Sequence, residues 1–138
     1  MGRIFQLILK TEIKNCSNMF HNCQNIKSID LSAFDSSKVE NMSGMFFKCI
    51  NLEELNLSNL DTKNVVDMHK MFQKCKSLEK IEFPSTFITK NVKDISLMFC
   101  DCHNLKNVNL NFETENVENM AGLFKNCFKL KKLDLFSY

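Results

Sequence analysis

The residues of this chain that could do nucleophilic, redox or metal chemistry are seven cysteines and three histidines. An odd number of cysteines is unusual for a secreted disulfide scaffold. The densest cluster is Cys100-Asp101-Cys102-His103, whose one-residue gap is tighter than the two-residue gap of common zinc motifs. A reactive thiolate also needs an accessible, electropositive setting. We therefore expect no catalytic site, no metal and no cofactor, and a redox protein using Cys100 is the chemical alternative.

Five of the cysteines close a motif that recurs along the whole chain. The motif, Met-Phe-x-x-Cys or a close variant, begins at Met19, Met45, Met71, Met98 and Leu123, so that the intervals are 26, 26, 27 and 25 residues. Apolar residues between the copies keep the same register, and such self-similarity indicates a repeat architecture. We expect one domain over residues 1–138, with a partial N-terminal unit at 1–18 and repeats starting near residues 19, 45, 71, 98 and 123.

Each unit combines two hydrophobic periods. Within residues 39–49 the apolar side chains are three or four positions apart, which predicts a short helix. Residues 55–57 alternate Leu-Asn-Leu, as in a short strand. Asn64, Asn91 and Asn116 stand where they could cap such helices. Small residues with a hydroxyl group favour a turn just before each predicted helix; they are Ser36, Thr62, Thr89 and Thr114.

A unit of this size cannot bury its apolar face alone, so the units are expected to stack. The predicted class is α/β, with the strands forming a parallel sheet on one side and the helices lying on the other. The motif cysteines then face the core in one column, whereas Cys100 points away from it. Stacked side chains point in parallel, which suits disulfide geometry poorly.

Two segments carry a resemblance to a known family. Asn41–Phe46, which reads Asn-Met-Ser-Gly-Met-Phe, and the turn Leu57–Thr62 resemble BspA-like leucine-rich repeats, a bacterial surface-protein repeat of about 26 residues. The resemblance covers about residues 13–138. It implies a right-handed leucine-rich-repeat solenoid of about five strand-turn-helix units. It also implies a non-catalytic binding role, often in adhesion at microbial cell surfaces.

The strand side of the stack is the candidate binding surface. Polar residues between the two apolar residues of each strand point outward, and stacking aligns them in a ladder. An extended surface of this kind is where solenoids bind partners. We expect a protein or glycan ligand there, and an ordinary solvated sheet face is the alternative. The ladder consists of Asp30, Asn56, Glu82, Asn109 and Asp134, with Glu54 beside it.

Composition excludes several other functions. The 18 basic and 16 acidic residues give a net charge of +2, which argues against a dedicated nucleic-acid binder. Three glycines are too few for a glycine-rich phosphate loop. Runs of apolar residues are too short for membrane insertion. These observations favour a non-enzymatic protein-interaction module.

The location and the ends of the stack leave alternatives open. The resemblance implies the cell surface or secretion, whereas the odd cysteine count and the lack of a recognisable signal peptide allow an intracellular scaffold in the cytoplasm. Apolar residues 4–9 are expected to fold over the first coil as a cap. The last unit carries no such cap, so we expect either self-association through the C-terminal coil or that the chain is a fragment of a longer array.

Overall fold

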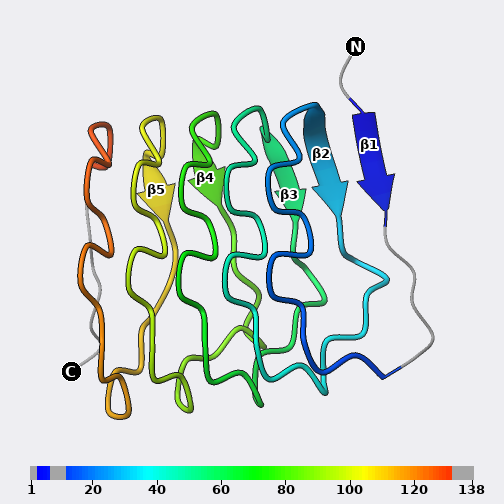
Figure 1. Ribbon diagram of the computed structural model, residues 1–138, viewed down its shortest axis with the longest axis vertical. Coiled ribbons are helices and arrows are strands. Elements are labelled where there is room, and N and C mark those ends of the chain that lie inside the picture. Colours follow the sequence, from blue (N-terminus) through cyan, green and yellow to red (C-terminus); the bar gives the residue numbers. More distant parts are fainter. Residues whose placement is uncertain (1–2, 7–11, 132–138) are drawn as a thin grey trace.

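A computed structural model of the protein describes residues 3–6 and 12–131. The chain winds into a stack of coils that follow one another along the molecule (Figure 1). Isolated parallel bridges join each coil to the next, from Asn15 to Asn41, Asp67, Asp94 and Asn119 in turn. We number the coils 1 to 5 by these five residues. Residues one repeat apart therefore lie side by side, as the register of the sequence predicts.

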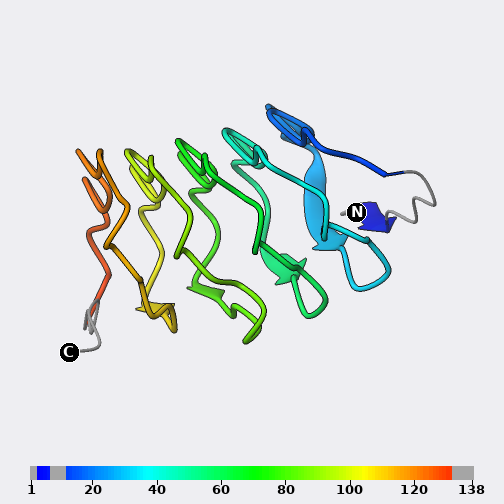
Figure 2. The same ribbon diagram turned by 90° about the horizontal axis from the view of Figure 1, so that it is seen from below.

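Short parallel strands line one side of the stack (Figure 2). They form two sheets, with the strand orders β1-β2-β3 and β4-β5. β1 lies outside the repeats and pairs with the strand of coil 1, so residues 4–6 extend the sheet over that coil as the sequence predicts. Residues 7–9 of the expected cap lie outside the described residues. The strands are β1 (Arg3–Gln6), β2 (Ile26–Asp30), β3 (Glu54–Asn56), β4 (Lys80–Ile81) and β5 (Asn107–Val108).

The predicted helices are wrong, because no residue of 3–6 or 12–131 lies in a helix. Residues 41–49 and their equivalents instead form consecutive tight turns, which we call the turn run of each coil. Alternate N–H groups bond within the coil, as from Phe47 to the Gly44 carbonyl at 3.0 Å. The others donate to the next coil, as from Phe46 to the Met71 carbonyl at 2.9 Å. The described fold is therefore built from strands and turns, not from an α/β unit.

Two residues in each turn run have the left-handed backbone that a helix cannot contain. In coil 2 these are Gly44, with φ of 60°, and Lys48, with φ of 62°. A type II turn requires a positive φ at its third residue, and a turn run repeats this requirement every four residues. For a residue other than glycine, the left-handed conformation costs about 1–2 kcal/mol. The hydrogen bonds to the next coil offset this cost. The equivalent pairs are Asn18 and Asn22, Lys70 and Lys74, Leu97 and Asp101, and Gly122 and Asn126.

The core runs through the stack as columns of equivalent residues. One phenylalanine of each turn run stacks on the next, with ring centroids 5.2 Å apart between Phe46 and Phe72 and 5.5 Å apart between Phe72 and Phe99. Most aliphatic columns of coils 2 to 4 are buried, as their spacing predicts, although Leu55 and Val108 on the strands are half-buried. Met120 of coil 5 differs, with 41% of its surface exposed. Each inner coil thus covers the apolar face of its neighbours.

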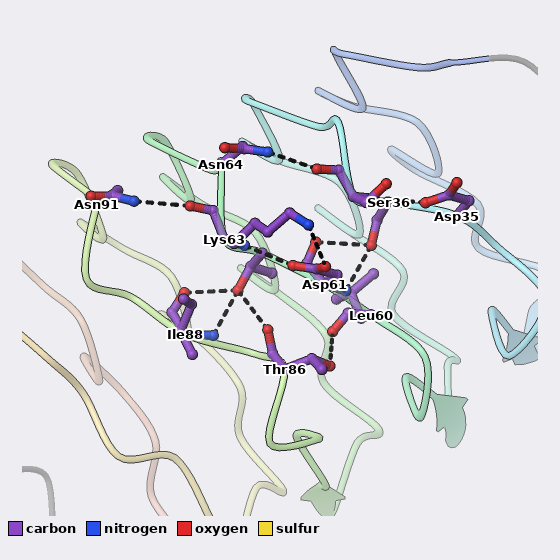
Figure 3. Close-up of polar contacts among 11 residues, drawn as sticks. Asp35, Ser36, Leu60, Asp61, Lys63, Asn64, Thr86, Ile88 and Asn91 are labelled. Carbon is purple, nitrogen blue, oxygen red and sulfur yellow. Dashed lines mark hydrogen bonds and ion pairs between the residues drawn. The ribbon is translucent and has the colours of Figure 1, made fainter.

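Buried hydroxyl groups join neighbouring coils in the segments between the strands and the turn runs, and Figure 3 shows the contacts of Ser36. Thr62 Oγ1 donates to the Ile88 carbonyl and accepts from the Ile88 N–H, both at 2.7 Å. Ser36 bonds both backbone groups of Asp61 in the same way. Thr89 does so with Glu113. These residues were expected merely to suit a turn, but each one satisfies two backbone groups of the following coil.

The asparagines predicted to cap helices have another role, because no described helix begins there. Asn64 Nδ2 donates to the Ser37 carbonyl of the preceding coil at 2.8 Å. Asn91 donates to the Lys63 carbonyl at 2.9 Å (Figure 3). Asn116 repeats the contact in coil 5. A side-chain amide can bridge coils in this way because it reaches a carbonyl one repeat earlier. These residues therefore position neighbouring coils.

Candidate functional site

The structure brings the described ladder residues together on the strand side. Asp30 pairs with Asn56 across β2 and β3, and Ser28 pairs with Glu54. Asn56, Glu82 and Asn109 are exposed, as is Glu54. Asp134 lies outside the described residues. The outward-facing ladder is thus present over four coils.

Several ladder side chains also fold the local backbone. Asp30 Oδ1 accepts a hydrogen bond from the Ser32 N–H at 2.9 Å, and Asn56 does the same for Ser58 at 3.0 Å. The hydrogen bonds from Ser32 lower the pKa of Asp30. Asn109 reaches back to accept from the Phe83 N–H at 2.9 Å. Sequence reasoning missed that these side chains fold the backbone. For Asp30 and Asn56 a signal was present, because an Asp or Asn two positions before Ser is typical of such a turn.

Glu82 of the ladder and Glu54 beside it are the carboxylates most available to a partner. Glu82 accepts from Lys80 Nζ at 3.2 Å, in an ion pair whose members are both exposed. Exposed pairs of this kind contribute little to stability. The Glu54 side chain makes no hydrogen bond or ion pair with any other described residue. Both carboxylates can therefore meet a ligand without disrupting the fold.

A groove of about 1020 Å³ runs along the strand side. A second hollow of about 530 Å³ adjoins it and shares Glu53, Glu54, Lys80 and Asn107 with it. The groove is open to solvent and lies over the place where β3 and β4 fail to pair. We call the two hollows together the strand groove. All described ladder residues and Glu54 line it.

The cysteine column is a structural feature of the core. Cys49, Cys75 and Cys102 are fully buried, whereas Cys23 and Cys127 of the end coils are half-buried. Every cysteine is a free thiol. The Cys75 thiol donates to the Phe46 carbonyl of the preceding coil at 3.2 Å, and its equivalents repeat the contact. The prediction of a buried column is confirmed for the inner coils.

Cys100 lies outside the packed core cluster, yet its side chain is not exposed to solvent. Its side chain is 4% exposed, because its repeat position lies between Gln73 of coil 3 and Lys125 of coil 5. Burial raises the pKa of Cys100, and the Asp101 carboxylate raises it further. Gln73 Oε1 is buried without a hydrogen-bond partner. A protonated, covered thiol is a poor nucleophile, which weighs against the redox alternative.

We predict that the thiols of the native protein react slowly at neutral pH and that the fold weakens in alkali. Burial raises the pKa of Cys49 to about 12 and that of Cys16 to about 11, from an ordinary 9.0. These thiols stabilise the fold fully below pH 9, and their contribution is lost as pH rises toward 12 because only the unfolded chain releases the protons readily. Thiol titration and chemical denaturation across this range measure both effects. A single fast thiol at neutral pH, above all Cys100, would instead support the redox alternative.

Sequence reasoning did not identify a Ser–His–Asp cluster on the turn runs. The buried Ser96 donates from Oγ to Asp94 Oδ1 at 2.6 Å, and its oxygen lies 2.7 Å from His69 Nδ1. In a nucleophilic triad, the histidine accepts the serine proton and the carboxylate orients the histidine. Here the carboxylate takes the serine hydrogen, so the cluster joins coils 3 and 4 without the geometry of a nucleophile. No group of His, Cys, Asp and Glu within the described ranges is arranged to hold a metal ion.

The repeats of this chain match a known family. A family model described as a Mycoplasma protein of unknown function, DUF285, matches residues 14–136. The chain belongs to this family. No curated protein matches the chain. For this DUF285 protein, residues 3–6 and 12–131 contain no helix able to cross a membrane.

Solved structures show the fold that the DUF285 protein shares. The crystal structure of the T. pallidum leucine-rich repeat protein TpLRR is similar over 94% of this chain, with a TM-score of 0.64 and 24% identity. A leucine-rich repeat protein from Bacteroides ovatus is similar over 92% of the chain, with a TM-score of 0.52 and 19% identity. The chain spans 56% of the first protein and 36% of the second. The fold is therefore that of leucine-rich repeat proteins.

Proposed function

We propose that this DUF285 protein is a non-enzymatic protein-interaction module that binds its partner on the strand side. The observation that carries the proposal is the strand groove, which gathers the polar ladder of coils 1 to 4 on one open surface. An extended face built from repeats suits a protein or glycan ligand. The Asn41–Phe46 segment further supports a BspA-like role in adhesion at a microbial surface.

The first test reverses charge on this surface. We expect Glu54→Lys/Glu82→Lys to abolish recovery of a partner in cross-linked pull-downs, because charged faces steer association. Surface substitutions usually change stability within about 0.5 kcal/mol each, so the melting curve should barely move. The matched control is Glu40→Lys/Glu115→Lys, which reverses two exposed carboxylates outside the strand groove. Equal loss of the partner in both variants would contradict a binding site on the strand side.

The alternative to a surface protein with this function is an intracellular scaffold. Free thiols in the core favour a reducing compartment, because disulfides form and persist in oxidising ones. Protease treatment of intact cells, followed by detection of this protein, separates the two locations. Digestion without lysis supports the surface role, and full protection supports the scaffold.

We also propose that the 138-residue chain self-associates through coil 5. Met120 is 41% exposed there, although Met42 and Met68 of the same column are fully buried. Within the described residues, the N–H groups that would bond a further coil have no backbone acceptor in coil 5, as at Gly122 and Phe124. Met120→Lys should reduce association measured by analytical ultracentrifugation, whereas Val66→Lys, at an exposed site of coil 3, should not. A chain that is monomeric at high concentration would contradict this interface.

A further inference from the structure

The strand side is interrupted at one place only among the described strands, between β3 and β4. β2 and β3 are joined by bonds such as Glu53 N–H to the Lys27 carbonyl at 2.8 Å, and β5 follows β4 with Lys106 N–H bonded to the Glu79 carbonyl at 2.7 Å. No backbone hydrogen bond joins residues 53–57 to residues 79–83. The turn runs of the same two coils stay joined. The interruption is therefore local to the strand groove.

The interruption coincides with an irregularity of the repeat. Phe83 and Phe87 are four positions apart, whereas the equivalent Leu57 and Leu60 are three apart. The extra residue falls beside Pro84, which has no N–H to donate. Backbone groups of β3 and β4 that face the interruption thus lack the partners that the other described strands supply. The flanking segments stay joined, with Thr86 Oγ1 donating to the Leu60 carbonyl at 2.6 Å, so a ligand can lie over the interruption but cannot enter the sheet as a further strand.

The lining of the strand groove has the opposite charge to the protein as a whole. Five carboxylates stand against two lysines, although the chain carries a net charge of +2. Both lysines are already paired, Lys80 with Glu82 at 3.2 Å and Lys106 with Glu79 at 3.0 Å. Lys27, outside the lining, also pairs with Glu53 at 3.9 Å, so Asp30 and Glu54 keep no lysine partner and their negative charge is complementary to a cationic ligand. The carboxylates are Asp30, Glu53, Glu54, Glu79 and Glu82.

We propose that the strand groove binds an extended cationic peptide lying along β3 and β4. The proposal rests on the strand side being the binding surface and names the chemistry of the partner. Successive residues of an extended chain face opposite ways, so Lys or Arg at alternate positions meets the groove. Its cations reach Glu54 and compete with Lys80 for Glu82. Its extended backbone lies over the groove, and the carboxylates confer selection for basic sequences.

The test uses an eight-residue fluorescent peptide of alternating Lys and Thr, with both ends blocked, in anisotropy titrations with the full chain. We expect binding that weakens at least tenfold in Glu54→Gln/Glu82→Gln and less than twofold in the control Glu40→Gln/Glu115→Gln. The control removes the same charge from exposed sites outside the groove. A peptide of alternating Glu and Thr should not bind.

Two results would overturn the proposal. One is the absence of binding by the Lys peptide, and the other is equal weakening in the two glutamine variants, which would indicate unspecific charge attraction. Circular dichroism melts show that each variant is folded before titration. A partner that is lost in Glu54→Lys/Glu82→Lys while the Lys peptide fails to bind would overturn the cationic-peptide proposal alone. A partner insensitive to that charge reversal would contradict the proposed function itself.

Discussion

Cys75→Asp is expected to unfold the protein or to lower its free energy of unfolding by several kcal/mol. Cys75 is fully buried, and its thiol donates to the Phe46 carbonyl of the preceding coil. Aspartate at this position either buries a charge or takes up a proton, and both cost free energy. Burial, together with the neighbouring Cys102 and Cys49 thiols, already raises the pKa of Cys75, so the site disfavours an anion.

Thermal and chemical denaturation measure this effect against two controls. Lys76→Asp places the same side chain at the next residue, which is exposed, and should change stability by about 0.5 kcal/mol or less. Cys100→Asp tests the burial of Cys100. We expect a marked loss of stability, because that side chain is 4% exposed. If Cys75→Asp were as stable as Lys76→Asp, the cysteine column would not face the core.

Thr62→Val is expected to cost about 2–4 kcal/mol although the two side chains have nearly the same shape. The hydroxyl of Thr62 satisfies both the N–H and the carbonyl of Ile88 at 2.7 Å (Figure 3). Valine leaves these two groups without a partner, and each unsatisfied buried polar group costs about 1–3 kcal/mol. The loss also loosens the contact between coils 2 and 3, beside the interrupted strands.

Thr62→Ser is the matched variant, since it keeps the hydroxyl and removes only a methyl group. We expect it to retain most of the stability that Thr62→Val loses. Urea denaturation and hydrogen exchange at the Ile88 amide measure the two variants. Protection of that amide in Thr62→Val equal to that of the native protein would show that the hydroxyl does not hold the coils together.

The stacked repeat and the composition of its core were predictable from the sequence. The intervals between copies of Met-Phe-x-x-Cys set which residues lie side by side, and the bridges from Asn15 to Asn119 follow that register. Burial of Met45, Phe72 and Cys102 follows as well, because a column of equivalent apolar residues has no other way to leave water. The ladder on the strand side was predictable for the same reason, from the alternation of short strands.

The turn runs were mistaken for helices because both structures place apolar residues three or four positions apart. One sequence signal distinguished them. Two of the three glycines, Gly44 and Gly122, occupy the same repeat position, where the backbone has φ of 60° and 65°. Asn18 stands at that position in coil 1 and tolerates the same conformation. The signal is weak, because Lys70 and Leu97 take the position in the other coils.

Sequence alone thus determined the repeat, the columns of the core and the side of the stack that carries the polar ladder. These depend on which residues are equivalent and which avoid water. Tertiary structure decided the course of the backbone, the burial of Cys100 and the interruption between β3 and β4. A helix satisfies its hydrogen bonds within itself, whereas a turn run sends every second N–H to the next coil. Which of the two forms is stable depends on the neighbouring coil, and no single repeat contains that information.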